Sequence, residues 1–172
     1  MRNKPTLRLL AISLVLVCTA GCDQFTKHLA RTQLGQQGSS AISGRFLQFT
    51  LAENPGAFLS IGASFPQSAR TTLTGFIGLA LALLLVHIVR STTLRPAPLF
   101  GLTLICAGGL SNLLDRVLRD GLVTDFMILR LGPLHTGIFN LADFAIVVGA
   151  FLVAIMWNRE RRTAISPPAN LS

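Results

Sequence analysis

The segment Leu73–Val89 reads LTGFIGLALALLLVHIV and contains no Asp, Glu, Lys or Arg. A helix that crosses the roughly 30 Å hydrocarbon core of a bilayer needs about 20 mainly apolar residues. The segment is close to that length, so it predicts a transmembrane helix. Three further segments meet the same criterion. The four predicted transmembrane helices comprise approximately residues 7–29, 73–89, 97–116 and 138–157.

The composition of the whole chain agrees with a membrane protein. Of its 172 residues 51% are hydrophobic and only 13% are charged, which is more apolar than a soluble domain of this size. The net charge of +8 could suggest a nucleic-acid partner, but the bases form no stripe with interleaved aromatic residues. We therefore expect no nucleic-acid binding. The cysteines and histidines show no metal-ligand spacing, so neither a metal site nor a cofactor is expected.

The orientation follows from the basic residues, because cytoplasmic segments of membrane proteins carry an excess of Lys and Arg. On one side of the predicted membrane eight bases face a single acid, Glu160. The eight bases are Arg2, Lys4, Arg8, Arg90, Arg95, Arg159, Arg161 and Arg162. This pattern predicts that both termini are cytoplasmic. The other six acids lie at or beyond the outer face, so carboxylate chemistry is expected there.

The first predicted helix allows a second interpretation. A basic start and an apolar core lead to the sequence Thr19-Ala20-Gly21-Cys22. This whole segment resembles a bacterial lipoprotein signal peptide that ends at a lipidated cysteine. The chain would then be a lipid-anchored scaffold. Thr19 replaces the bulky aliphatic residue usual at that position, and Asp23 and Lys27 continue at helical spacing. We therefore favour a retained helix.

The outer segment between the first two helices, about residues 30–71, is predicted to form a small periplasmic β-sheet. Residues 47–51 read LQFTL, and this alternation of apolar and polar residues is typical of a half-buried strand. Asn54-Pro55-Gly56 favours a turn, after which residues 57–61 can return as a second strand. The predicted fold class is an all-α membrane protein of four transmembrane helices with this small sheet.

Polar residues recur at helical spacing near the outer ends of three predicted helices. These residues are Asp23 and Lys27 on the first helix, Asn112, Asp115 and Arg116 on the third, and Asn140 and Asp143 on the fourth. On the third helix Gly108 lies on the same stripe. A charged side chain at the centre of a membrane helix costs about 2.5–3.5 kcal/mol on insertion scales. Such residues usually face the interior of the bundle and mark a functional site.

Asp143 is predicted to lie about 9 Å below the start of its helix, at a rise of 1.5 Å per residue. Water solvates such a carboxylate poorly, and Asp125 in the preceding segment can approach it. Two adjacent carboxylates share one proton, so they can activate water and protonate a leaving group. Spacing alone leaves two alternatives, in which Asp125 caps the outer face and Asp143 forms an ion pair with Arg116. The pairs Asp23–Lys27 and Asp115–Arg116 could likewise be structural ion pairs.

Five short motifs occur in order along almost the whole chain. They are Asp23-Gln-x-Thr-Lys27, Asn54-x-Gly56-Ala57-Phe58, Gly108-Gly109-x-x-Asn112-x-x-Asp115-Arg116, Gly121-x-Val123-x-Asp125-Phe126 and Phe139-Asn140-Leu141-Ala142-Asp143. With these motifs the chain resembles the lipoprotein signal peptidases, also called type II signal peptidases. Ser111 stands where that family usually has Gly, Phe144 stands where a small residue is common, and Pro55 and Leu59 vary the second motif. These differences leave the implied mechanism intact but not the implied local substrate contacts.

The resemblance implies a role for each motif residue. Asp125 and Asp143 would form a catalytic dyad. The substrate site would be lined by Asn54, Gly56, Asn112, Arg116 and Asn140. Support would come from Asp23, Lys27, Gly108 and Asp115.

We expect one membrane domain, residues 1–162. Residues 163–172 contain Pro and Ser and are predicted to form a disordered cytoplasmic tail. The resemblance implies a monomeric aspartic endopeptidase of the bacterial inner membrane with no cofactor, whose partners are prolipoprotein substrates and membrane lipid. The bond cleaved would precede a cysteine that carries a diacylglyceryl group. The alternative is a non-enzymatic small carrier, since carriers also place polar residues in the membrane. Carriers commonly show paired halves or broken helices, and this sequence shows neither.

The distribution of bases leads to a test of topology. A reporter that is active only outside the cytoplasm should work when fused after Gly38 or Gly132. It should fail when fused after Thr93 or Thr163, because Thr93 lies within a basic segment and Thr163 directly follows one. The opposite pattern of reporter activity would place the carboxylates on the cytoplasmic side and refute the orientation.

Overall fold

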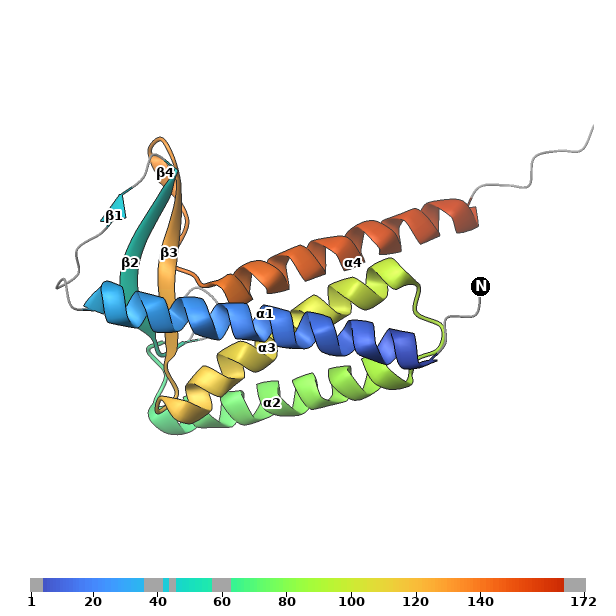
Figure 1. Cartoon of the computed structure of the whole chain (residues 1–172), viewed down its shortest axis with the longest axis horizontal. Coiled ribbons are helices and arrows are strands. Elements are labelled where there is room, and N and C mark those ends of the chain that lie inside the picture. Colours follow the sequence, from blue (N-terminus) through green and yellow to red (C-terminus); the bar gives the residue numbers. More distant parts are fainter. Residues whose placement is uncertain (1–4, 36–41, 44–45, 57–62, 166–172) are drawn as a thin grey trace, which may run out of the picture.

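The computed structural model describes residues 5–35, 42–43, 46–56 and 63–165 (Figure 1). It contains four long helices, α1 (Pro5–Gln33), α2 (Gln67–Arg90), α3 (Pro96–Leu118) and α4 (Leu141–Ile165). Each contains a segment long and apolar enough to cross a membrane. The four predicted spans are therefore confirmed.

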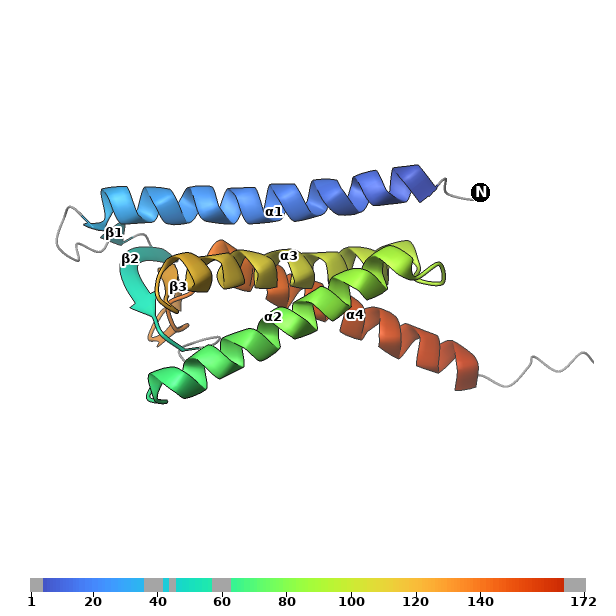
Figure 2. The same ribbon diagram turned by 90° about the horizontal axis from the view of Figure 1, so that it is seen from below.

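The helix α3 lies at the centre of the bundle and contacts the other three helices (Figure 2). Glycines allow it to approach α4 closely. A Cβ atom on Gly108 would lie 2.4 Å from the carbonyl oxygen of Ala142, and one on Gly149 would lie 2.5 Å from that of Gly101. The neighbouring Gly109 faces α2 instead. Small residues are typical of membrane helix interfaces because they let two backbones meet.

A four-stranded antiparallel sheet lies across one end of the bundle (Figure 1). Its order is β1 (Ile42–Ser43), β2 (Leu47–Asn54), β3 (Val123–Leu131) and β4 (Leu134–His135). The strand predicted at residues 47–51 is present. Its long partner is β3, which comes from the segment between α3 and α4. The return strand predicted at residues 57–61 falls in a range that the structure does not describe, namely residues 57–62.

The sheet is attached to the C-terminal end of α1. Ala30 and Leu34 form a buried cluster with Phe126 of β3. Phe49 of β2 and Met127 of β3 pack against the same cluster. Because α1 extends beyond its predicted end near residue 29, its last turns support the strand that contains Asp125.

The helix α4 begins later than predicted. The Asn140 side chain accepts a hydrogen bond of 2.9 Å from the Asp143 N–H, and the Asp143 carboxylate accepts one of 3.3 Å from the Asn140 N–H. This reciprocal pair is a capping box, which starts a helix at the next residue, Leu141. Asp143 therefore lies in the first turn and not about 9 Å inside the helix. At its other end α4 extends to Ile165. The first three residues of the predicted disordered tail, 163–165, are therefore helical.

Candidate active site

Asp125 and Asp143 come from different elements and meet at Asn140. Asp125 lies on β3, and Asp143 lies in the first turn of α4. The Nδ2 of Asn140 donates to Oδ1 of Asp125 at 2.7 Å, while its Oδ1 accepts the Asp143 N–H. The two acids are 2% and 6% exposed. The structure thus places two buried carboxyl groups in one hydrogen-bond network.

Amide groups bind the remaining carboxylate oxygens. Asn54 at the end of β2 donates to Oδ2 of Asp125 at 2.9 Å, and Asn112 of α3 donates to Oδ1 of Asp143 at 2.9 Å. In the part of the chain that the structure describes, neither carboxylate forms an ion pair. Neutral donors orient the two groups without fixing their charge, so either group is able to hold a proton.

Burial changes the acidity of Asp125, which lies outside the membrane helices. Loss of solvation raises its pKa to about 6, and the hydrogen bond from Asn54 opposes this rise. The nearby charge of Asp143 raises the pKa further, whereas Lys27 lowers it. Desolvation is the largest effect because it penalises the charged form of a carboxyl group. Asp125 therefore retains a proton at a higher pH than an exposed Asp.

Arg116 does not form the ion pair considered for Asp143. Its guanidinium donates to the carbonyl oxygen of Gly56 at 2.7 Å and to that of Asn112 at 3.3 Å. The Gly56 N–H in turn donates to Asn54 at 2.9 Å. Arg116 therefore connects α3 to the chain that follows β2, next to the two acids. Ala57 and Phe58 of the same motif lie outside the described residues.

A buried lysine lies behind this network. Lys27 of α1 is 2.7 Å from the carboxylate of Asp23 and 3.1 Å from that of Asp115, and all three side chains are essentially inaccessible. Its Nζ also donates to Oδ1 of Asn112 at 2.8 Å. Since that oxygen accepts bonds from Lys27 and from Asn140, the amide nitrogen of Asn112 faces Asp143. Lys27 thus sets the orientation of a group that touches the candidate site.

The considered pairing of Asp115 with Arg116 is wrong, because Asp115 pairs with Lys27. Consecutive residues on a helix do not face each other. Asp115 also accepts the Thr124 N–H at 3.2 Å, which connects α3 to β3. Asp23 accepts the Ala142 N–H at 2.8 Å and so joins α1 to the first turn of α4.

Two residues of the network, Gln24 and Ser111, were not assigned to the site from the sequence. Ser111 donates to Asp23 at 2.7 Å, and Gln24 donates to both Ser111 and Asp115 at 3.0 Å. Ser111 lies four residues before Asp115, so helical spacing could have indicated it. The described residues include no group of three His, Cys, Asp or Glu side chains arranged to hold a metal ion.

Comparison with known proteins identifies the family. A sequence model of the family described as signal peptidase (SPase) II matches residues 14–158, which include every site residue discussed above. The chain belongs to the signal peptidase II family. It is therefore a protease, and the alternative of a small carrier is not supported. Its family and its four spans indicate a multi-pass protein of the bacterial inner membrane.

Individual relatives cover nearly the full length of the chain. A lipoprotein signal peptidase of Desulforapulum autotrophicum is 32% identical over 92% of this chain and 98% of its own length. One of Chlorobium luteolum is 38% identical over 86% and 90%, respectively. The solved structure of a bacterial membrane enzyme, 25% identical, superposes with a TM-score of 0.75 over 94% of each chain.

The Lys27 cluster leads to a prediction about stability. Lys27→Met should lower the free energy of unfolding by about 3–5 kcal/mol, because it leaves two carboxylates buried without their cation. Arg119→Met is the matched control. It removes only a half-exposed contact with Glu53 at 3.9 Å, which should be worth about 0–1 kcal/mol. Thermal unfolding of both variants in detergent would measure the difference, and equal midpoints would show that Lys27 has no structural role.

Proposed function

We propose that the family's reaction, the removal of signal peptides from lipoproteins, is carried out here by Asp125 and Asp143 acting as an aspartic protease dyad. The observation that supports this proposal most directly is their convergence on Asn140, buried and outside any ion pair among the described residues. Acids that serve only structure are normally paired when buried, as Asp23 and Asp115 are. The two site acids differ from them in this respect.

The proposed chemistry uses one proton shared by the two carboxyl groups. The ionised carboxylate removes a proton from water, whose oxygen then bonds to the carbonyl carbon of the substrate. The protonated carboxyl group donates its proton to the amide nitrogen, and the carbon–nitrogen bond breaks. The raised pKa of Asp125 favours retention of the proton that the second step needs.

The surrounding residues have two proposed tasks. Asn54, Asn112 and Asn140 bind the carboxylate oxygens and hold them in place for the attacking water. Arg116 and Gly56 line the margin of the substrate site, where Arg116 binds the backbone of the chain after β2. The remaining four positions, Asp23, Lys27, Gly108 and Asp115, support these groups from behind without touching the substrate.

The position of the dyad suits a substrate that is part lipid and part peptide. Asp143 lies in the first turn of a membrane helix, and Asp125 lies in the sheet that crosses the end of the bundle. The acyl chains of a diacylglyceryl cysteine could therefore remain in the bilayer while the preceding peptide bond reaches the carboxylates. With both termini cytoplasmic, this site faces the outer side. All of its residues come from one chain, so a monomer is sufficient.

The dyad is tested by isosteric substitution. Asp125→Asn and Asp143→Asn should each lower turnover of a diacylglyceryl-modified prolipoprotein by about a thousandfold or more, because Asn cannot exchange the proton. Their double variant should be no worse than either single one, as for residues that act as a unit. Asp120→Asn is the control, since Asp120 is an exposed acid on the same side. Turnover near the parent rate in either dyad variant, at equal protein level, would refute the mechanism.

The raised pKa predicts the pH dependence of the reaction. The proton of Asp125 is lost as the pH rises through about 6, so kcat/KM should fall above that value. Asn54→Ala removes a hydrogen bond that favours the ionised form, so it should raise the pKa of Asp125 and shift this alkaline limb to higher pH. Thr72→Ala, which changes only a hydroxyl bonded to its own helix, should not shift it. An Asn54→Ala profile that coincides with the parent profile would exclude Asp125 as the titrating group.

A further inference from the structure

An apolar groove lies between α1 and α3 at the end of the bundle away from the dyad. Its volume is about 990 Å³, near the upper end of the roughly 300–1,000 Å³ range of small-molecule sites. Ile12 and Val15 of α1 face Leu99 and Phe100 of α3 along its walls. We call this hollow the α1–α3 groove. Its walls suit an aliphatic chain.

A partly buried guanidinium, that of Arg8, lies in the wall of the α1–α3 groove. Arg8 donates from Nη2 to the carbonyl oxygen of Ile88 at 2.9 Å, which joins α1 to the last turn of α2. The Nε of Arg8 is buried, yet among the described residues it has no hydrogen-bond partner. Arginine keeps its proton in proteins, and a buried N–H without an acceptor is rare and costly. An anionic oxygen bound in the groove would supply the missing acceptor.

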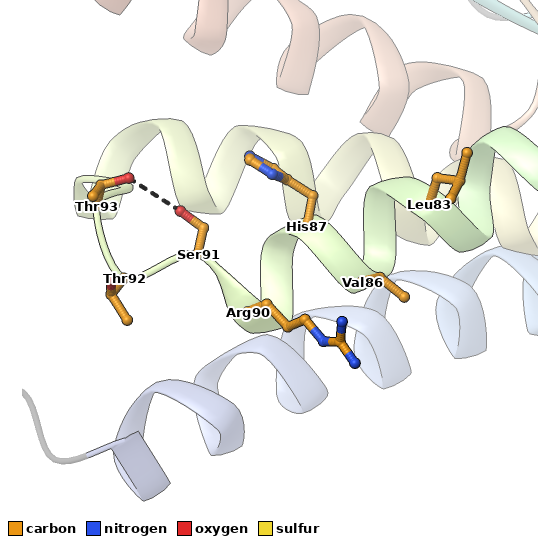
Figure 3. Close-up of a pocket in the computed structure, with 7 residues that line it drawn as sticks. All are labelled: Leu83, Val86, His87, Arg90, Ser91, Thr92 and Thr93. Carbon is orange, nitrogen blue, oxygen red and sulfur yellow. Dashed lines mark hydrogen bonds between the residues drawn. The ribbon is translucent and has the colours of Figure 1, made fainter.

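A second hollow of about 520 Å³ surrounds the turn between α2 and α3 (Figure 3). Its polar lining includes His87, Arg90, Ser91, Thr92 and Thr93. Thr92 also lines the α1–α3 groove, so the two hollows adjoin. In Figure 3 the side chains of Arg90 and Thr92 extend to the side of α2 on which α1 lies. A guanidinium beside a hydroxyl is a common partner for phosphate oxygens.

We propose that the α1–α3 groove and the adjoining turn bind one anionic phospholipid. Its acyl chains occupy the groove, and its phosphate lies among Arg8, Arg90 and Thr92. Charge selects this occupant, because the described lining of the two hollows includes Arg8 and Arg90 and no acid. Basic pockets between membrane helices on the cytoplasmic side bind anionic headgroups. The n-region of a signal peptide is itself positive, so this end repels it.

Such a lipid would stabilise the least covered part of the bundle. The apolar part of α1 is less buried by protein than that of any other span, while α3 is the most buried. At this end a cluster of Ile12, Ile88 and Cys106 holds α1 against α2 and α3. A lipid in the α1–α3 groove would add apolar contacts between α1 and α3. It would also bridge Arg8 on α1 to Arg90 at the end of α2.

Native mass spectrometry of the full chain, delipidated in neutral detergent, tests the proposal. One phosphatidylglycerol should bind at least tenfold more tightly than one phosphatidylcholine. A basic residue near an anionic headgroup is worth about 1 kcal/mol, so Arg8→Gln and Arg90→Gln should each weaken phosphatidylglycerol binding about fivefold. Arg159→Gln removes the same charge from the same end without lining either hollow, so it should leave the affinity unchanged. Ala11→Trp should weaken both lipids, because Ala11 lines the groove and a large side chain fills it.

Several results would overturn the proposal. Equal binding of the two lipids would exclude recognition of the headgroup. Equal losses of phosphatidylglycerol affinity in Arg90→Gln and Arg159→Gln would show that only the net charge matters. Arg90 is exposed, so its substitution should not disturb the fold. Saturation by glycerol phosphate alone would identify a plain phosphate site, and displacement of the lipid by a synthetic signal peptide would identify the peptide as the occupant. None of these measurements uses the protease activity, so they are independent of the proposed dyad.

Discussion

The ammonium group of Lys27 can lie inside a membrane bundle only because carboxylates surround it, and the rest of the site depends on that pairing. Asp23 and Asp115 lie within 3.1 Å of it, and each carboxylate reaches a further element. Asp23 accepts a backbone N–H of α4, and Asp115 accepts one of β3. Removing one partner of a buried ion pair usually costs several kcal/mol. One cation therefore fixes α1, α3, α4 and the sheet relative to one another.

This arrangement separates two kinds of buried acid. Asp23 and Asp115 share the Lys27 cation, whereas Asp125 and Asp143 receive mainly neutral amide donors. A direct ion pair would have stabilised the charged form of the second pair. Lys27 acts on Asp125 only at longer range, and burial outweighs it, which leaves the pKa of Asp125 at about 6. The same lysine orients Asn112, so it influences Asp143 through hydrogen bonding.

The sequence predicted the four spans because membrane insertion depends on the length and hydrophobicity of local segments. It also predicted which helix faces are polar, since helical spacing is local. It could not predict that β2 pairs with β3, because alternation tells which side chains share a face but not which distant strand is the partner. The start of α4 was predicted too early because Ile138 and Phe139 are apolar and were counted as part of the helix, although the capping box at Asn140 starts it at Leu141. Helical spacing alone allowed Asp143 to pair with either Asp125 or Arg116, because spacing contains no information on contacts between distant segments. Only the family resemblance favoured the pairing of Asp125 with Asp143.

The hydrogen bond from Ala142 to Asp23 joins residues that are 119 positions apart, between the first and the last helix of the chain. During synthesis α1 leaves the ribosome first and α4 last. Asp23 and Lys27 can find Asp115 once α3 has entered the membrane, but Asp143 and its cap exist only after α4 is made. The two candidate catalytic groups therefore meet at the final step of biogenesis. Under the proposed mechanism a partly inserted chain could not cleave peptides, so the docking of α4 would itself switch the enzyme on.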